Sequence, residues 1–356
     1  MENCIYIYHR EFDAKRGNRI DQNIIIDSLI NVSSFYKDVT ANRKIVTLEI
    51  DEIYVKEGIN YKAGKLHGFA EISKDNNPVG IGKTSYGFLI ESVFGSMKDV
   101  VELCPIAGIE AEQLVTKTLD IMKFFQENGF TIVCISADNN RLNQKTFKIL
   151  TNVDGGTLNE SFPNPRDSND TVFVKFEAVH IFKNVRNNWL KLPAKTFAYL
   201  NFDKSEDTEI KHAEFSQIRE LFRRQASHTI RSTHKLSYRS VFVSNFDRQK
   251  VGLVDAVFHD SPIAALIQEG YNERMKGYND FMQLVLKWWN IQNVKSGKIK
   301  RDDSMMPITS IDDERLEFLE KFVLWLERMS INDETRNHQF TSDTSSALRQ
   351  SSRSAS

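Results

Sequence analysis

Asp51 is the first residue of this sequence whose position suggests chemistry. It lies in residues 45–55, where Val46, Leu48 and Ile50 alternate with polar residues in the period-two pattern that predicts a β-strand. A carboxylate in the middle of a strand is costly to bury unless it is paired or binds a cation. The sequence leaves two interpretations of Asp51: a metal ligand, or an outward-facing residue of an edge strand.

Asp138 is the second candidate. It directly follows residues 130–137, a continuous apolar run that begins after Gly129 and is typical of a strand buried on both faces. A carboxylate at the C-terminal end of a central strand lies at the edge of an α/β sheet where ligands usually bind. The alternative is that Asp138 caps the helix that follows it.

If the two strands are neighbours, Asp51 and Asp138 converge, and their chemistry is that of a divalent cation site. Two adjacent carboxylates repel, so one takes up a proton unless Mg²⁺ or Mn²⁺ bridges them. Two such ions about 3.5–4 Å apart activate a water and stabilise the leaving oxygen of a phosphodiester. That arrangement needs a third carboxylate to complete the metal ligands.

The elements that must position these aspartates alternate between strands and helices. Residues 152–170 predict a loop, because they are rich in Gly, Asn, Pro and Asp. The predicted strands are 45–55, 65–73, 86–101 (one bent strand or two), 130–137 and 172–176. The predicted helices are 110–127, 143–150 and 179–191. This order indicates the α/β class, a mixed sheet with flanking helices as in ribonuclease-H-like domains.

The remaining segments predict helices or little structure. Residues 1–40 predict a helical lead-in, and residues 41–200 would form the ribonuclease-H-like domain. Residues 201–330 predict an all-α region, since no strand pattern is evident there and helical periodicity recurs at 213–226, 261–290 and 312–329. Residues 331–356 are rich in Ser, Thr, Asn and Arg and predict a disordered tail.

Two segments concentrate positive charge on a chain whose formal net charge is −1. In the predicted helix 179–191, Lys and Arg recur at roughly helical spacing, and residues 211–250 contain nine Lys or Arg against three acidic residues. Such segments suit a phosphate backbone, although a single basic run is usually a solvated helix face. The candidates for phosphate contact are Lys183, Arg186, Arg223 and Arg224.

Composition excludes several classes of protein. The near-neutral charge argues against a uniformly basic nucleic-acid binder, but not against a locally basic groove. The three cysteines lie far apart, which predicts a reducing compartment and no structural zinc site. No apolar run approaches the ~20 residues of a membrane helix, and the first residues are too charged for a signal peptide. We therefore expect a soluble intracellular protein without a membrane partner.

Several strings in register resemble the P-element-like transposases, which include the THAP-domain transposases. From about residue 44 to residue 350 these are LEIDEIYV, ISADNNRLNQKTF, VHIFKNVRNNWL, SNFDRQKVGLVDAVFHDSPIAAL, FMQLVLKWWNIQNVKS and DDERLEFLEKFVLWL. The resemblance implies a ribonuclease-H-like catalytic domain interrupted by a helical insertion, which in the P-element transposase binds GTP. By position, Asp51 and Asp138 resemble the first and second catalytic aspartates that bind Mg²⁺ or Mn²⁺. It further implies transposon-end DNA as partner, a homo-oligomer and a nuclear location.

The sequence also departs from this family's pattern. The family's third catalytic acid follows the insertion, and FTSDTSSALRQSSRS resembles the segment just upstream of it. The family's zinc-dependent THAP module is not apparent, and Glu177 stands where many relatives have Asp before the His180 motif. The resemblance therefore implies a transposase core with weak or no strand transfer by this chain alone. The alternative is a non-catalytic, transposase-derived protein that binds DNA or other partners.

Overall fold

The structure is a computed structural model that describes residues 44–62, 64–73, 80–152, 158–203, 209–268, 273–294 and 303–355. The predicted lead-in, residues 1–40, lies outside these ranges. Within them, no helix is long and apolar enough to cross a membrane. The described residues form two compact units. The first contains the described residues up to Ala137 together with residues 163–172. The second contains residues 138–162 and the described residues from Phe173 onward.

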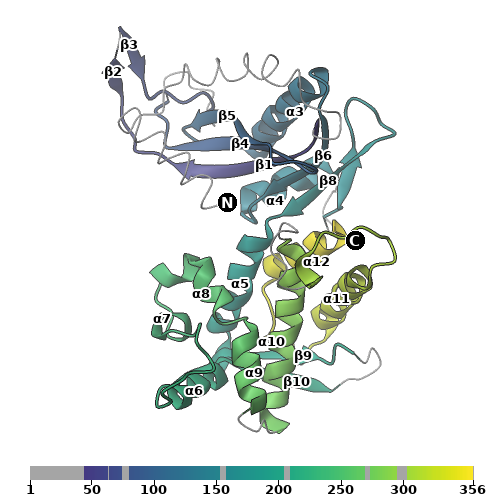
Figure 1. Cartoon of the computed structure of the whole chain (residues 1–356). Helices are drawn as coiled ribbons and strands as arrows, with labels where there is room; N and C mark the ends of the chain where they lie inside the picture. The colour runs from purple at the N-terminus through teal and green to yellow at the C-terminus, as the bar shows by residue number, and fades with distance from the viewer. Residues whose placement is uncertain are drawn as a thin grey trace. The chain divides into compact units, whose positions relative to one another are not determined.

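The first unit is organised around strand β1, Ile45–Tyr54 (Figure 1). Its alternating residues Val46, Leu48 and Ile50 are at most 1% exposed, as the period-two pattern predicts. On one side β1 pairs antiparallel with β4, which in turn pairs with β5; on the other it pairs parallel with β6. The six-stranded sheet has the order β5-β4-β1-β6-β8-β7. Its further strands are β4 Thr84–Ser92, β5 Lys98–Ile106, β6 Thr131–Ala137, β7 Ser161–Pro163 and β8 Thr171–Phe176.

The mixed sheet and its helices confirm the predicted α/β architecture. Helix α3, Ala111–Glu127, begins at Glu110, whose backbone N–H donates to the Gln113 side chain at 2.9 Å. It ends before Gly129, whose φ of +81° is a conformation that glycine adopts readily at the end of a helix. The chain then enters β6, so this helix and strand lie where the sequence predicts them.

The predicted strand 65–73 needs correction, whereas for residues 86–101 the structure has the second of the two predicted alternatives. Residues 86–101 belong to two strands, β4 and β5. Of residues 65–73, Lys65–His67 form strand β3, which pairs with β2, Asn60–Lys62, in a separate two-stranded sheet. Phe69 and Ile72 form only isolated bridges, with Ile81 and Ile106. Gly68 ends the pairing of β3 with β2: its φ is +112°, and a Cβ there would lie 2.1 Å from the carbonyl oxygen of Gly58.

The second unit is mainly helical but contains a β-hairpin that the sequence analysis missed. Strand β9, Thr196–Leu200, lies at the end of the predicted ribonuclease-H-like domain and pairs antiparallel with β10, Ile210–Glu214. Only β10 lies inside the region predicted to be all-α. In β10 only Ala213 is buried, so the strand carries no apolar alternation. The helices are α4 Arg141–Leu150, α5 Ala178–Lys191, α6 Phe215–Gln225, α7 Tyr238–Val241, α8 Val251–Asp255, α9 Asp260–Gln268, α10 Glu273–Gln292, α11 Glu314–Ile331 and α12 Ser342–Arg353. Short 3₁₀ turns are η2 Pro193–Lys195, η3 Phe246–Gln249 and η4 Asp303–Met305.

The prediction of a disordered tail is wrong for residues 342–353, which form α12. Ala347 and Leu348 of this helix are buried. Its Gln350 accepts a hydrogen bond from the backbone N–H of Phe176 at 3.1 Å, and its Ser352 accepts one from the Trp288 indole at 3.1 Å. Small Ser and Ala side chains let the helix pack closely, so a composition that is poor in large apolar residues still forms an ordered element.

Candidate functional site

The register of β1 and β6 brings the two candidate aspartates to adjacent positions in the sheet. Ile50 and Ala137 are Cα partners in this parallel pair. Asp51 directly follows Ile50, and Asp138 directly follows Ala137. Strand β6 ends at Ala137, whereas β1 continues to Tyr54 beside β4. The register therefore places both aspartates at the edge of the sheet where β6 ends. The condition for a shared site, that these two strands are neighbours, is therefore met.

Asp51 lies on a central strand, because β1 is flanked by β4 and β6. This excludes the interpretation of Asp51 as a residue of an edge strand. Its side chain is half-buried, and its Oδ1 accepts a hydrogen bond from the Glu52 backbone N–H at 2.9 Å. The residue opposite Asp51 on β4 is Gly87, which has no side chain.

Glu49 is a second carboxylate on the same face of β1, two residues before Asp51. The Lys98 ammonium lies 3.1 Å from its Oε2 and 2.7 Å from Oε2 of Glu91. Burial raises the pKa of Glu49 above its ordinary value, although Lys98 opposes the shift. Glu49 is not among the candidates predicted from the sequence, although the period-two pattern places it on the face of Asp51.

A raised pKa at Glu49 predicts a pH dependence of stability. Ionising Glu49 costs more in the folded protein than in the unfolded chain, so the folded protein loses stability as pH rises above 4.5 through the raised value. We expect Glu49→Gln, which does not ionise, to abolish this loss. Urea unfolding at about pH 4 and about pH 7 measures it. The exposed Glu57→Gln is the control; an unchanged pH dependence in Glu49→Gln contradicts the assignment.

Asp138 is not the N-cap of the helix that follows it. The cap of α4 is Asn140, whose side chain accepts a hydrogen bond from the Asn143 backbone N–H at 2.8 Å. Oδ1 of Asp138 instead accepts from the Asn143 side-chain amide at 2.6 Å and from the Asn140 backbone N–H at 3.4 Å. Asn143 is buried, so this amide fixes the carboxylate in one orientation. The string DNNRLN contains both asparagines, but their roles depend on geometry that the sequence does not specify.

Carboxylates such as Asp51 and Asp138 are the oxygen ligands that Mg²⁺ and Mn²⁺ prefer, so the donor chemistry fits a hard cation. In the part of the chain that the structure describes, no group of three or more His, Cys, Asp or Glu could hold a metal ion. Glu177 directly follows β8 and is the N-cap residue of α5; its Oε2 lies 3.6 Å from Nε2 of His180.

Two of the four basic candidates are buried rather than solvent-facing. Lys183 is 6% exposed and Arg186 is fully buried in α5. The Arg186 guanidinium donates from Nη2 to the carbonyl oxygens of Asp247 and Arg248, at 3.1 and 2.9 Å. Burial, and then the nearby Arg248 charge, lowers the pKa of Arg186 to about 10. Phosphate binding by these two residues stays a prediction, and it requires a ligand that enters this interior.

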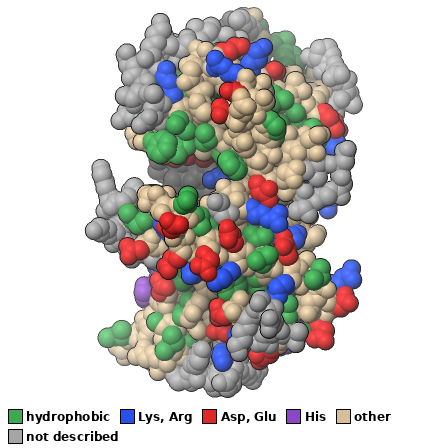
Figure 2. Space-filling model, turned by 90° about the vertical axis from the view of Figure 1, so that its right-hand side faces the viewer, with side chains coloured by type: hydrophobic (Ala, Val, Ile, Leu, Met, Phe, Trp, Pro, Cys, Tyr) green, Lys and Arg blue, Asp and Glu red, His purple; other side chains and the backbone are tan. Residues whose placement is uncertain are grey.

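Arg223 and Arg224 are exposed on α6, as a phosphate contact requires. The Arg224 Nε lies 4.0 Å from a carboxylate oxygen of Glu220, one helical turn away. On the face of the molecule shown in Figure 2, basic and acidic side chains are interspersed rather than forming one basic field. The distribution on this face agrees with the net charge of −1.

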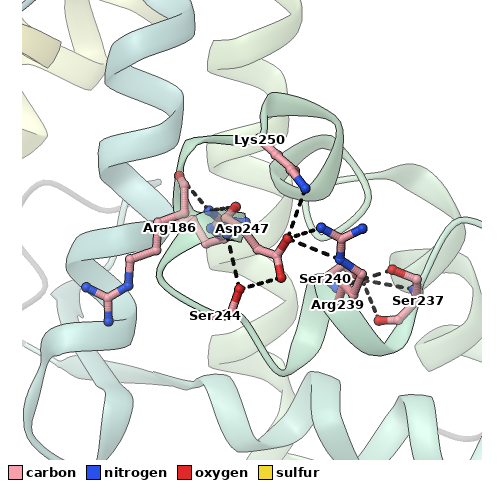
Figure 3. A network of polar contacts seen from close by, with 8 residues as sticks. Arg186, Ser237, Arg239, Ser240, Ser244, Asp247 and Lys250 are labelled. Carbon is pink, nitrogen blue, oxygen red and sulfur yellow. Dashed lines mark hydrogen bonds and ion pairs between the residues drawn. The ribbon is translucent and has the colours of Figure 1, made fainter.

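Asp247 is the centre of a polar network beside Arg186 (Figure 3). Its carboxylate accepts hydrogen bonds from Arg239, with an Nε to Oδ1 distance of 3.1 Å, and from the Ser244 hydroxyl at 2.7 Å. The Lys250 ammonium lies 3.4 Å from the same carboxylate. These partners, Arg239 first, hold the pKa of Asp247 well below its usual range. The network therefore ties α7, η3 and α8 together, with Arg186 joining them to α5.

The comparisons with known proteins agree with this fold. Residues 26–151 match the family model described as "TNP-like, RNase H N-terminal domain", a range that includes Asp51 and Asp138. A solved structure, "Drosophila P element transposase strand transfer complex", superposes with a TM-score of 0.71 at 17% sequence identity. The match covers 98% of this chain and 75% of that chain. No curated protein matches. The likeness confirms the ribonuclease-H-like sheet followed by a largely helical region.

Proposed function

We propose that this chain is the core of a DNA transposase of the P-element type, in which Asp51 and Asp138 bind Mg²⁺ or Mn²⁺. The observation that carries the proposal is the Ile50–Ala137 register, which puts the two aspartates at one edge of a ribonuclease-H-like sheet. The matching family model spans both residues, and the structural likeness extends over nearly the whole chain.

Each aspartate accepts a hydrogen bond that would orient it as a ligand. The Glu52 backbone N–H holds Oδ1 of Asp51, and the Asn143 amide holds Oδ1 of Asp138. Such partners fix the direction of metal ligands and increase affinity. A bound divalent cation would supply an activated water for phosphodiester hydrolysis and stabilise the leaving oxygen during strand transfer. The two-metal scheme also requires a third carboxylate, so cleavage and strand transfer both depend on that further residue.

We extend the proposal to GTP, transposon-end DNA, a homo-oligomer and a nuclear location, all of which the family resemblance implies. A feature of Arg186 supports the binding of an anionic ligand in the helical region. Its Nη1 is buried and has no hydrogen-bond partner among the described residues. A buried guanidinium with an unused donor is stabilised by an anion, so Arg186 and Lys183 are candidates for the phosphates of a guanine nucleotide.

A thermal-stability titration with Mn²⁺ tests the metal site. We expect Mn²⁺ to raise the melting temperature of the unsubstituted chain because it binds the folded state preferentially. Asp51→Asn should abolish the shift, whereas Asp120→Asn, which alters an exposed residue of α3, should retain it. A shift that is unchanged in Asp51→Asn contradicts the proposed site.

The second candidate function is a DNA-binding protein without catalysis. It is favoured by the exposed basic residues of α6, Arg223 and Arg224, which are independent of the aspartates. Two results together would support this function. DNA binding would weaken steeply with salt and persist in Asp138→Asn, and Mn²⁺ would not shift the melting temperature. Mn²⁺-dependent DNA cleavage that is lost in Asp138→Asn supports the transposase.

A further inference from the structure

Arginine side chains of α6 contact aromatic rings in and next to α7. Both helices belong to the second unit and are labelled in Figure 1. The guanidinium carbons of Arg219 and Arg223 lie 5.1 and 5.5 Å from the centre of the Phe242 ring. Phe242 also stacks with Tyr238, with ring centres 4.7 Å apart and an interplanar angle of 26°. We call these four residues, Arg219, Arg223, Tyr238 and Phe242, the α6–α7 platform.

The platform presents a flat aromatic surface to solvent. Tyr238 is 67% exposed although its ring is stacked on Phe242, so the stack orders the ring without covering it. Phe246, a few residues further along, is 89% exposed. Exposed aromatic rings concentrated in one short segment are costly in water and mark interaction surfaces.

The platform also carries positive charge that the protein itself does not neutralise. Burial and the adjacent Arg223 charge lower the pKa of Arg219, so the two guanidinium groups repel each other. Arg219 donates to the carbonyl oxygen of Val241 at 3.0 Å. In the described ranges neither Arg219 nor Arg223 forms an ion pair with a carboxylate. An anionic partner would relieve this repulsion.

The Asp247 network includes Arg239 of α7, and Ser237 and Ser240 lie beside it (Figure 3). Ser237 caps α7 by accepting a hydrogen bond from the Ser240 backbone N–H at 3.2 Å. Arg239, the residue after Tyr238, is bound to Asp247, and the backbone of Asp247 is bound to buried Arg186. The exposed ring is therefore attached to a fixed base, which reduces the entropy lost when a partner stacks on it.

We propose that the α6–α7 platform binds an unpaired nucleic-acid strand, with a base stacked on Tyr238 and adjacent phosphates paired with Arg219 and Arg223. The inference rests on the proposed function only in taking this strand to be DNA. A combination of basic residues with an exposed ring suits a single strand because every unpaired base offers a π-face. The bases of a duplex are stacked on one another, so a duplex engages the arginines but not the ring. A protein partner would lack the repeating phosphates that match two adjacent guanidinium groups.

Fluorescence anisotropy with a labelled thymidine oligonucleotide, in EDTA and at low salt, tests the platform on the full chain. We expect Tyr238→Ala to weaken binding about 5- to 100-fold, since stacking on one aromatic side chain has this range of effect. Tyr238→Phe and Tyr238→Trp should retain binding, because they preserve the stacking ring. Arg223→Ala should weaken binding and reduce the salt slope by about one.

An abasic oligonucleotide separates stacking from charge. On this strand Tyr238→Ala should have no effect, whereas Arg223→Ala should still weaken binding. The controls are Tyr61→Ala and Arg336→Ala, which alter side chains that are 73% and 76% exposed outside the platform. Circular dichroism confirms that each variant is folded.

Three outcomes overturn the proposal: unchanged affinity in Tyr238→Ala, an equal loss on the abasic strand, or binding of duplex that depends on Tyr238 as strongly as binding of the single strand. Because the assay contains EDTA, it is independent of the metal site. A Mn²⁺ shift that persists in Asp51→Asn overturns the proposed catalytic function alone. An affinity that is unchanged in Tyr238→Ala overturns the platform alone.

Discussion

Asp51→Asn is expected to lower Mn²⁺-dependent phosphodiester cleavage by more than about 100-fold, because it removes a proposed metal ligand. Asp138→Asn should have the same effect for the same reason. The loss should exceed that caused by residues that only orient ligands, which is roughly 10- to 100-fold. Nicking of supercoiled DNA, measured as a rate relative to the unsubstituted chain, provides the readout.

Asn143→Ala tests how the site is supported. Its side-chain amide donates to Oδ1 of Asp138 at 2.6 Å. We therefore expect Asn143→Ala to lower the cleavage rate by roughly 10- to 100-fold and to weaken the apparent affinity for Mn²⁺. The matched control is Asn169→Ala, which removes an exposed amide that donates to Asp167.

For the first prediction, a cleavage rate of Asp51→Asn within a few-fold of that of the unsubstituted chain contradicts the assignment of that aspartate.

Arg186→Ala is expected to destabilise the protein by about 3–5 kcal/mol, the largest effect on stability that we predict. The substitution leaves a cavity in the helical unit and removes the donors to the Asp247 and Arg248 carbonyl oxygens. Urea unfolding measures the change in free energy. Arg186→Met should cost less, since it keeps most of the volume and removes a buried charge.

Arg336→Ala is the control for this prediction, because Arg336 is 76% exposed and should change stability by no more than about 0.5 kcal/mol. A cost below about 1 kcal/mol for Arg186→Ala would show that the buried guanidinium does not hold α5 to the Asp247 network. In that case the base of the α6–α7 platform would also be less rigid than its hydrogen bonds indicate.

The parts of the fold that follow strong patterns were predictable. β1 and β6 bury regular apolar runs, and α3 ends at a glycine, so their positions follow from periodicity and from backbone conformation. Strand β10 and helix α12 were not predictable in this way. One buries a single alanine and the other packs through small polar residues, so tertiary contacts rather than hydropathy determine them.

The candidate site was likewise predictable from the sequence only in part. The aspartates could be proposed because each follows or lies within an apolar strand, and the neighbouring register of β1 and β6 confirms the pairing of those strands. The sequence did not show that Asn140 rather than Asp138 caps α4, because both are good capping residues. Nor did it show that Lys183 and Arg186 are buried, since helical spacing of basic residues usually indicates a solvated face.

A crystal structure of the full chain soaked in Mn²⁺, with anomalous diffraction, tests the central claim most directly. We expect an anomalous peak at the edge of the sheet where β6 ends, within about 2.0–2.3 Å of carboxylate oxygens of both Asp51 and Asp138. The peak should be absent from crystals of Asp51→Asn. Carboxylates that point to opposite faces of the sheet, or a Mn²⁺ ion bound elsewhere with none between these two residues, would contradict it.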